Sequence, residues 1–438
     1  MEISHKEIQD NCSKNRAKLF ERMLPQSVAI IVGNGEVVRN GDVHYAYRQN
    51  SDLLYLSQFN EPQSILLLSN LNGRNEFIMF VRPKDKAKEI WTGKRFGTEG
   101  AIKHYGADKA CVIGDLDQVL TDMLKLAKNV YYTLGIDESV DAKFMNAWKT
   151  FKPALFDAGK VISELRLFKS PTEIKLMQKA ARISAKAHEH AMRTLGQSGR
   201  KNRIKLENQL QAIIEADFRF NGGTGLAYGS IVAGGNNATT LHYESNDAKI
   251  GSGDLVLIDA GCEVAGYASD ITRTFPASGK FSPSQKAIYE AVLEAQMAAI
   301  AMCRPGNTIQ SVHDTARTVL EAKLNELGIL GQNGTKITDF FMHGTSHYLG
   351  LDVHDVGSYK DPNNNDDKAG KNRKLEPGMV ITVEPGLYFE KSDTRVNKIY
   401  RGIGVRIEDD VLITKDGHVV LSQAAAKTVD DIESLMRN

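Results

Sequence analysis

The chain has 438 residues, of which 42% are hydrophobic and 25% are charged, as in an ordinary globular protein. Because a single core rarely grows to this length, we expect two domains or three. The 55 basic and 54 acidic residues leave a net charge of +1, which excludes a strongly basic binding face for nucleic acid or an anionic membrane. A small or neutral substrate is therefore expected.

The N-terminal stretch MEISHKEIQDNCSKNR contains no apolar segment of signal-peptide length, and no run of about 18 apolar residues occurs anywhere in the chain. We therefore expect a cytoplasmic protein that does not bind membranes. The cysteines lack CxxC spacing, which argues against a disulfide framework or a zinc knuckle, so we expect reduced thiols in or near the cores. They are Cys12, Cys111, Cys262 and Cys303.

Short apolar runs alternate with helical stretches between residues 25 and 160. The runs are SVAIIVG, SILLLS, EFIMFV, KACVIG and NVYYTLGI, and DLDQVLTDMLKLAK is typical of the helices. This alternation predicts an α/β domain with a largely buried sheet.

The segment SELRLFKSPTE marks the end of that domain. Ser170 is placed to cap a helix that starts at Pro171, and Glu173, three residues after the cap, completes the signal. We therefore predict an N-terminal domain over residues 1–165 and a second domain over residues 166–438.

The second domain mixes long amphipathic helices with strand-like runs. Helices are predicted at residues 172–195, 205–220, 284–303 and 308–327. Strands are predicted near residues 228–234, 254–260, 268–275, 379–384 and 403–413. Because these elements do not follow strict βαβ order, we expect an α+β arrangement with a mostly antiparallel sheet. The polar stretch at 361–374 is a candidate for disorder.

A short repeat lies within the second domain. Residues 253–261 and 378–386 share the spacing glycine, five residues, carboxylate, one residue, glycine. Each is an apolar strand that delivers an acid at its far end, and each precedes a second strand that carries another acid. The four acids are Asp259, Asp270, Glu384 and Glu408. If the two related halves pack face to face, these acids converge.

The segment HGTSHYLGLDVHD, residues 343–355, holds three histidines and two aspartates. Its glycines and Val353 disfavour a helix, so we expect an irregular strand-loop-strand segment, the kind of backbone that often displays functional side chains. Spacing alone leaves three alternatives open: a metal site, a catalytic acid/base cluster or a polar loop.

An isolated carboxylate at the edge of a hydrophobic layer is costly and needs a compensating cation. Four acids and one histidine from residues 343–355 form too acidic a set for a structural zinc site but suit two divalent ions, such as Mn²⁺, Co²⁺ or Zn²⁺. Two such ions activate a bridging water for hydrolysis. Taken singly, each acid has an ordinary alternative as a turn, cap or solvated residue, so the prediction depends on their joint occurrence.

The sequences IDAGCEVAGYASDITRTF, HGTSHYLGLDVHDVG, ITVEPGLYF and GVRIEDDVLIT together resemble the metallopeptidase family that includes methionine aminopeptidase, prolidase and aminopeptidase P. The stretches RNGDVHYAYRQNSDLLYLSQFNEPQSILLL and EIWTGKRFG look like the N-terminal domain of bacterial aminopeptidase P. The resemblance implies an α+β protein with a C-terminal, pseudo-symmetric pita-bread (creatinase/methionine aminopeptidase-like) domain and a smaller N-terminal α/β domain.

The resemblance also implies the site residues. It makes Asp270 and Glu408 bridging ligands of two divalent ions per chain, for which Mn²⁺ is expected and Co²⁺ or Zn²⁺ are alternatives. The full ligand set is Asp259, Asp270, His347, Glu384 and Glu408. Glu384 also takes the proton of the attacking water, His354 donates to the carbonyl oxygen and His343 orients the substrate. The remaining substrate contacts are His242, Tyr388, Arg406 and Trp91.

Several of these residues have ordinary alternatives. His242 could be a hydrogen-bonded structural residue, Tyr388 a core tyrosine, and Arg406 one partner of a surface salt bridge. The resemblance implies that Trp91 lies over the active site of a neighbouring subunit, in a homodimer or homotetramer. The alternative is a packed interdomain tryptophan.

The function expected is that of a metal-dependent aminopeptidase, which releases the first residue of Xaa-Pro-Yaa peptides by attack of a dimetal-bridged hydroxide. An Xaa-Pro bond lacks the N–H that ordinary peptidases recognise, so direct polarisation of its carbonyl is advantageous. Prolidase, which cleaves only Xaa-Pro dipeptides, is the nearest alternative. A non-catalytic scaffold and a metal-free, creatinase-like hydrolase are less favoured, because all five ligands are present.

Overall fold

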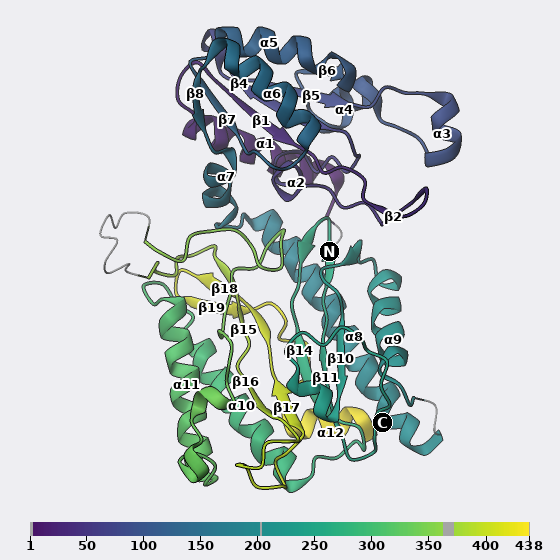
Figure 1. The fold of residues 1–438 in the computed structure, drawn as a ribbon, viewed down its shortest axis with the longest axis vertical. Helices are drawn as coiled ribbons and strands as arrows, with labels where there is room; N and C mark the ends of the chain where they lie inside the picture. The colour runs from purple at the N-terminus through teal and green to yellow at the C-terminus, as the bar shows by residue number, and fades with distance from the viewer. Residues whose placement is uncertain (1–2, 202–203, 362–371, 438) are drawn as a thin grey trace. The chain divides into compact units, whose positions relative to one another are not determined.

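The computed structural model consists of two compact units, Met1–Arg166 and Leu167–Asn438 (Figure 1). The residues that it describes are 3–201, 204–361 and 372–437. Most of the predicted disorder candidate at 361–374 lies outside the described residues. Across the part of the chain that is described, no helix has both the length and the apolar character needed to span a membrane. All four cysteines are free and at least partly buried, as predicted.

The N-terminal unit contains a six-stranded sheet in the order β6-β5-β4-β1-β7-β8. Its strands are β1 (Ser27–Val32), β4 (Ile65–Ser69), β5 (Glu76–Val81), β6 (Lys109–Val112), β7 (Asn129–Tyr132) and β8 (Ala154–Phe156). β1 pairs antiparallel with β4 and parallel with β7, so the sheet is mixed. Every residue of β1 is buried. The predicted α/β pattern with a largely buried sheet is confirmed.

Helices pack on this sheet and a small hairpin extends from it. The helices are α1 (His5–Arg22), α2 (Ser51–Ser57), α3 (Lys86–Thr92), α4 (Gly97–Tyr105), α5 (Leu116–Leu126), α6 (Glu138–Phe151) and α7 (Ala158–Arg166), and the hairpin joins β2 (Val38–Asn40) to β3 (Val43–His44). Leu120 of α5 and Phe144 of α6 share one apolar core with Ile30 of β1. In contrast, α3 has no buried residue.

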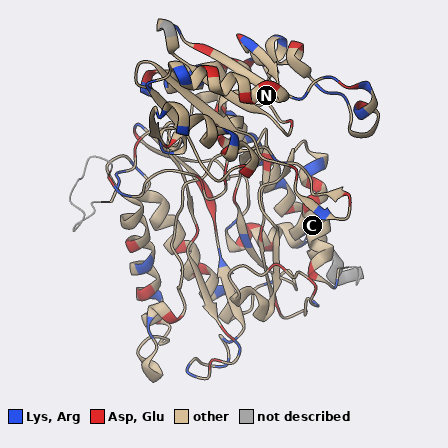
Figure 2. Ribbon diagram, turned by 45° about the horizontal axis from the view of Figure 1, so that its top comes forward, with Lys and Arg blue, Asp and Glu red and all other residues tan. Residues whose placement is uncertain are grey.

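The C-terminal unit has five α-helices among its described residues. They are α8 (Pro171–Lys201), α9 (Glu207–Phe220), α10 (Pro283–Ala301), α11 (Ile309–Glu326) and α12 (Val429–Arg437). The first four match the predicted helices within a few residues. Ser170 and Glu173 exchange hydrogen bonds between side chain and backbone, which confirms the predicted start of α8. Figure 2 shows charges of both signs spread along the helices rather than gathered on one of them.

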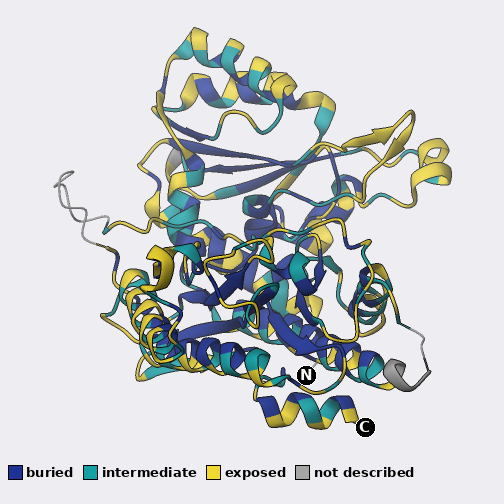
Figure 3. Ribbon diagram, turned by 60° about the horizontal axis from the view of Figure 1, so that its bottom comes forward, coloured by how far each residue is buried: buried dark blue, intermediate teal, exposed yellow. Residues whose placement is uncertain are grey.

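The strands of this unit lie between the helix pairs α8/α9 and α10/α11 (Figure 1), and most of their residues are buried (Figure 3). They are β9 (Gly225–Leu226), β10 (Ile231–Gly234), β11 (Leu255–Asp259), β12 (Cys262–Val264), β13 (Tyr267–Ala268), β14 (Thr272–Pro276), β15 (Val380–Val383), β16 (Gly386–Phe389), β17 (Ile403–Arg406), β18 (Asp409–Thr414) and β19 (Gly417–Val420). All of the described pairings are antiparallel, as predicted.

Two of the strand predictions are wrong in one respect. The runs 268–275 and 403–413 are not single strands, because each breaks at its acidic residue. β13 pairs with β12, whereas β14 pairs with β11. In the same way, β17 pairs with β16, whereas β18 pairs with β15. The chain therefore passes from one pairing partner to another at Asp270 and at Glu408, and the bend this requires interrupts the strand.

Candidate metal centre

A cavity of about 310 Å³ lies within the C-terminal unit and gathers most of the predicted site residues. The predicted residues in its lining are His242, Asp259, Asp270, His343, His347, His354, Glu384, Arg406 and Glu408. Tyr388 lies next to this set, since its hydroxyl is 2.8 Å from His343 Nε2. Trp91 belongs to α3 of the other unit and is not part of the lining.

The two halves of the repeat supply the four carboxylates in equivalent ways. Asp259 ends β11 and Glu384 directly follows β15. Asp270 and Glu408 sit at the two bends that precede β14 and β18. The halves meet there, because the backbone N–H of Glu408 donates to the carbonyl of Thr272 at 3.1 Å. The four acids therefore converge because two similar hairpins pack against each other.

His347 is held with one ring nitrogen facing these acids. Its segment pairs with β15 through an isolated bridge between Tyr348 and Ile381, so only the first strand of the predicted strand-loop-strand has a counterpart. His347 Nδ1 is 3.0 Å from the Tyr348 carbonyl, which can only accept, so Nδ1 carries the proton. Nε2 then lies 3.5 Å from Asp270 and 3.6 Å from Glu384.

The donor set has the composition of a site for divalent cations. Asp270, His347 and Glu408 each offer one ligand atom, and these three atoms lie within 4.8 Å of one another. Such a mixture of carboxylate oxygens and one imidazole nitrogen suits Mn²⁺, Co²⁺ or Zn²⁺. Asp270 and Glu408 are only 5% and 2% exposed, so they are not solvated surface charges. Buried carboxylates this close together need a cation.

The pKa values of Glu384 and Glu408 show that the metal-free cavity disfavours charged carboxylates. Burial raises the pKa of Glu384 to about 7, and the positive charges of His347 and Arg406 offset this effect only in part. Burial, followed by the charges of Asp270 and Glu384, holds the pKa of Glu408 well above its usual range. Without a cation these two acids are therefore driven towards their protonated forms, and a bound cation would favour their charged forms.

Arg406, Tyr388 and His343 form a directed chain of hydrogen bonds. Arg406 Nη2 donates to Asp259 at 2.6 Å, and Nη1 donates to the Tyr388 hydroxyl at 3.0 Å. Because that hydroxyl accepts from Arg406, its own proton goes to His343 Nε2. His343 Nδ1 donates to the Gly344 carbonyl at 2.7 Å, so the ring is neutral. Arg406 is 4% exposed, which rules out the surface salt bridge that was its alternative.

His354 and His242 are the exposed histidines of the lining. The ring centre of His354 lies 4.2 Å from that of His347. Partial burial and the neighbouring His347 lower the pKa of His354, so its ring is neutral near pH 7. A neutral imidazole at the cavity wall can donate one hydrogen bond to a ligand.

The sequence analysis did not identify Tyr228 and Thr272, which form hydrogen bonds with the acids of the site. The Tyr228 hydroxyl lies 2.6 Å from Asp259 and 2.5 Å from Asp270, and therefore links the two acids of the first half. Thr272 Oγ1 donates to Glu408 at 2.7 Å. Thr272 follows Asp270 by two residues, so alternation along a strand could have indicated it. Tyr228 precedes β10 and has no comparable signal in the sequence.

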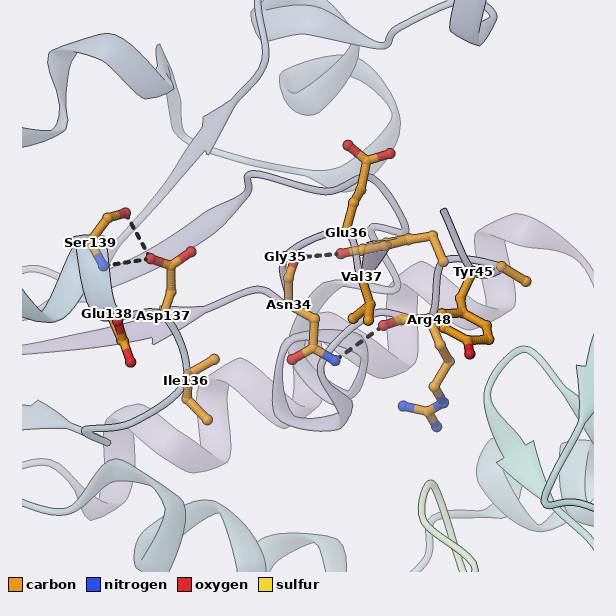
Figure 4. A pocket seen from close by; sticks show the side chains of 12 residues that line it. Asn34, Gly35, Glu36, Val37, Tyr45, Arg48, Ile136, Asp137, Glu138 and Ser139 are labelled. Carbon is orange, nitrogen blue, oxygen red and sulfur yellow. Dashed lines mark hydrogen bonds between the residues drawn. The ribbon is translucent and has the colours of Figure 1, made fainter. Parts of the chain in front are cut away.

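The N-terminal unit contains a larger hollow, of about 620 Å³, near the β2–β3 hairpin (Figure 4). Its Asp137 caps helix α6 by accepting from the backbone N–H groups of Ser139 and Val140. Its lining among the described residues includes no histidine. Size therefore does not identify the chemical site, and the smaller cavity with its acids and histidines does.

Trp91 is 87% exposed and its neighbour Ile90 is 82% exposed. Trp91 is therefore not packed inside its own unit, and a place between the two domains stays the alternative prediction. Ile90 and Trp91 therefore place two large apolar side chains next to each other on the surface of α3, as is common at protein interaction sites.

Comparisons with known proteins give a consistent result. The sequence model of metallopeptidase family M24 matches residues 175–415, and that of the aminopeptidase P N-terminal domain matches residues 12–132. The Xaa-Pro aminopeptidase of Haemophilus influenzae is 43% identical over 429 residues, which cover 97% of this chain and 96% of that protein.

Solved structures agree as closely. Pseudomonas aeruginosa aminopeptidase PepP superposes with a TM-score of 0.91 at 43% identity and 98% coverage of both chains. Zinc-substituted Escherichia coli aminopeptidase P, solved in complex with product, gives a TM-score of 0.90 at 38% identity, with 100% of this chain and 99% of that chain covered. A variant of the same E. coli enzyme was solved in complex with substrate and matches equally well.

Proposed function

Because the chain belongs to metallopeptidase family M24 and has Xaa-Pro aminopeptidase activity, we propose that its acidic cavity removes the first residue of peptides whose second residue is proline. The observation that carries this assignment is the convergence of four carboxylates and His347 Nε2 on one cavity. As a member of a metallopeptidase family, the enzyme requires divalent metal ions.

We propose that Asp259, Asp270, His347, Glu384 and Glu408 hold two divalent ions, with Asp270 and Glu408 shared between them. Such ions, when bound, supply Lewis-acid polarisation of a carbonyl and activation of water near pH 7. Mn²⁺ is the proposed native ion, with Co²⁺ or Zn²⁺ as alternatives, because the donor types accept all three. Arg406 and Tyr228 orient Asp259 through their hydrogen bonds.

Glu384 is the proposed proton acceptor for the attacking water. Glu384 faces the cavity 3.6 Å from His347 Nε2, where its carboxylate can accept a proton from a water molecule. His354 is placed to donate a hydrogen bond to the scissile carbonyl as negative charge develops on its oxygen. The free α-amino group of the substrate would bind at one of the ions and near these carboxylates, which limits cleavage to the first peptide bond.

We propose that His343 and His242 line the part of the cavity that binds the proline residue of the substrate. Both ring nitrogens of His343 are already engaged, by the Gly344 carbonyl and the Tyr388 hydroxyl. His343 therefore meets the substrate with its ring edge or face, a suitable surface for the apolar pyrrolidine ring of proline. His242 is exposed at the cavity rim and remains a proposed substrate contact.

A substrate series tests the function directly. We expect wild-type protein loaded with Mn²⁺ to hydrolyse Xaa-Pro-Yaa tripeptides, to leave Xaa-Ala-Yaa peptides largely intact, and to lose activity with EDTA until Mn²⁺ is restored. Product release is measured by chromatography. Turnover of Xaa-Pro dipeptides alone would indicate a prolidase. Inability to retain divalent ions after gentle purification would indicate a scaffold.

We propose that Trp91 contacts the active site of another copy of the chain in a homodimer or homotetramer. Its 87% exposure, beside the exposed Ile90, is the support from the structure. We expect Trp91→Ala to lower kcat/KM by about tenfold, as loss of one aromatic contact of roughly 1.5 kcal/mol would. The metal content of the Trp91→Ala variant should equal that of the wild-type protein. A wild-type protein that sediments as a fully active monomer would contradict this proposal.

The cytoplasmic location stays a prediction.

A further inference from the structure

One backbone carbonyl links the metal-facing histidine to the end of its loop. The carbonyl oxygen of Tyr348 accepts from His347 Nδ1 at 3.0 Å and from the backbone N–H of Asp355 at 2.8 Å. The second bond closes residues 348–355 into a compact loop whose last turn carries His354. The orientation of the His347 ring therefore depends on the same atom that closes the loop.

A buried ion pair fixes the end of this loop. Asp355 Oδ2 lies 3.0 Å from Lys169 Nζ, and both side chains are only 1% exposed. Lys169 is itself anchored, because its backbone N–H donates to the Gly378 carbonyl at 2.8 Å and Ser170 after it caps α8. A side chain at Gly350 would collide with the Asp355 carboxylate, so the loop is packed tightly around the pair.

The loop is also tied to the opposite half of the unit. The backbone N–H of Ala268 donates to the Gly350 carbonyl at 2.8 Å. Ala268 ends β13, two residues before Asp270. A displacement of the loop would therefore reach His347 through the Tyr348 carbonyl and Asp270 through β13.

The chemistry of the pair suggests why the chain keeps it. Burying two charges is costly, and a well-packed apolar pair commonly gives equal or greater stability. Apolar side chains could not provide the directional bond from Lys169 Nζ to Asp355 that sets the position of the Asp355 backbone. Residues that orient a metal-binding imidazole through hydrogen bonds have a strong effect on metal affinity.

We propose that Lys169 and Asp355 are positioning residues that set the His347 imidazole and hold His354 beside it. This inference rests on the proposed function, in which His347 is a ligand and His354 contacts the substrate. Lys169 lies two residues before α8, 178 positions before His347 along the chain, and is linked to the His347 ring through Asp355 and the Tyr348 carbonyl.

The test compares Mn²⁺ affinity, melting temperature and peptide hydrolysis in three variants: Lys169→Met, Asp355→Asn and the double variant. Mn²⁺ affinity is measured by competition with a chelator. We expect each single variant to bind Mn²⁺ roughly 10–100-fold more weakly, the range for partners that orient a ligand. Because Asp355→Asn preserves size and the backbone N–H, it carries the test if Lys169→Met does not fold.

The double variant separates positioning from stability. It buries no unpaired charge, so we expect its melting temperature to recover towards the wild-type value. Its Mn²⁺ affinity should stay low, because methionine has no hydrogen-bond donor and the bond between the two side chains is absent. Recovery of affinity together with stability would show that the pair is only structural and would overturn the proposal.

A matched control is available in the N-terminal unit. Arg166 Nη1 and Asp52 form another ion pair, at 2.7 Å, in which the arginine side chain is 4% exposed. Arg166→Met should lower the melting temperature and leave Mn²⁺ affinity unchanged. Equal loss of affinity in this control would also overturn the proposal. Wild-type protein that binds no Mn²⁺ would instead refute the proposed function, and that measurement precedes any comparison of variants.

Discussion

Asp270→Ala and Glu408→Ala are each expected to abolish both metal retention and peptidase activity. Their carboxylates and His347 Nε2 offer ligand atoms within 4.8 Å of one another, and we propose that both acids bridge the two ions. Since changes to residues that only orient a ligand already cost roughly 10–100-fold in affinity, loss of a bridging carboxylate should cost more than about 100-fold. Metal analysis after gel filtration and hydrolysis of an Xaa-Pro-Yaa peptide measure the two effects.

Stability provides an independent check on this interpretation. Because burial and the neighbouring acids disfavour the charged form of Glu408, Glu408→Gln should raise the melting temperature of the metal-free protein while it weakens metal binding. Each 1 kcal/mol of relieved repulsion would add roughly 2–4 °C. Asp254→Asn is a suitable control, because Asp254 precedes β11 and accepts from the backbone N–H of Gly251. A lower melting temperature for Glu408→Gln would indicate a structural acid rather than a ligand.

His354→Ala is expected to keep the metal and lose turnover. The His354 ring lines the cavity beside His347, and its lowered pKa leaves it a neutral hydrogen-bond donor at pH 7. Loss of a donor to the developing oxyanion typically lowers kcat by about 10²–10³-fold, with little effect on metal content. Steady-state kinetics with an Xaa-Pro-Yaa substrate, together with metal analysis of the same sample, measures both quantities.

The contrast with His347→Ala makes this result interpretable. His347 Nε2 points at Asp270 and Glu384, so its removal should empty the site. If His354→Ala emptied the site and His347→Ala did not, the two roles would have to be exchanged. Equal metal loss in both would mean that the whole segment 343–355 acts as one ligand-bearing unit.

The sequence predicted the architecture well, because local signals agreed with the fold. The Ser170 cap and the periodic helices marked the C-terminal unit, and the alternation of apolar runs marked the N-terminal unit. The comparisons confirm the predicted family, fold and activity. The roles assigned to individual site residues stay predictions, although nine of them line one cavity.

What the sequence could not predict depends on contacts between distant segments. The breaks at Asp270 and Glu408 arise because each chain segment changes its pairing partner, and periodicity carries no information about partners. Tyr228 reaches two acids 31 and 42 positions away. The Lys169–Asp355 pair spans 186 positions, and a lysine before a helix cap otherwise resembles any solvated residue.

Each acid-bearing segment pairs with two different strands, so the site depends on contact between the two halves of the C-terminal unit. Neither half owns a complete site: one contributes Asp259 and Asp270, and the other contributes His347, Glu384 and Glu408. Ions bound between the halves would stabilise their contact, so chelation should weaken the packing of one half against the other before either half unfolds.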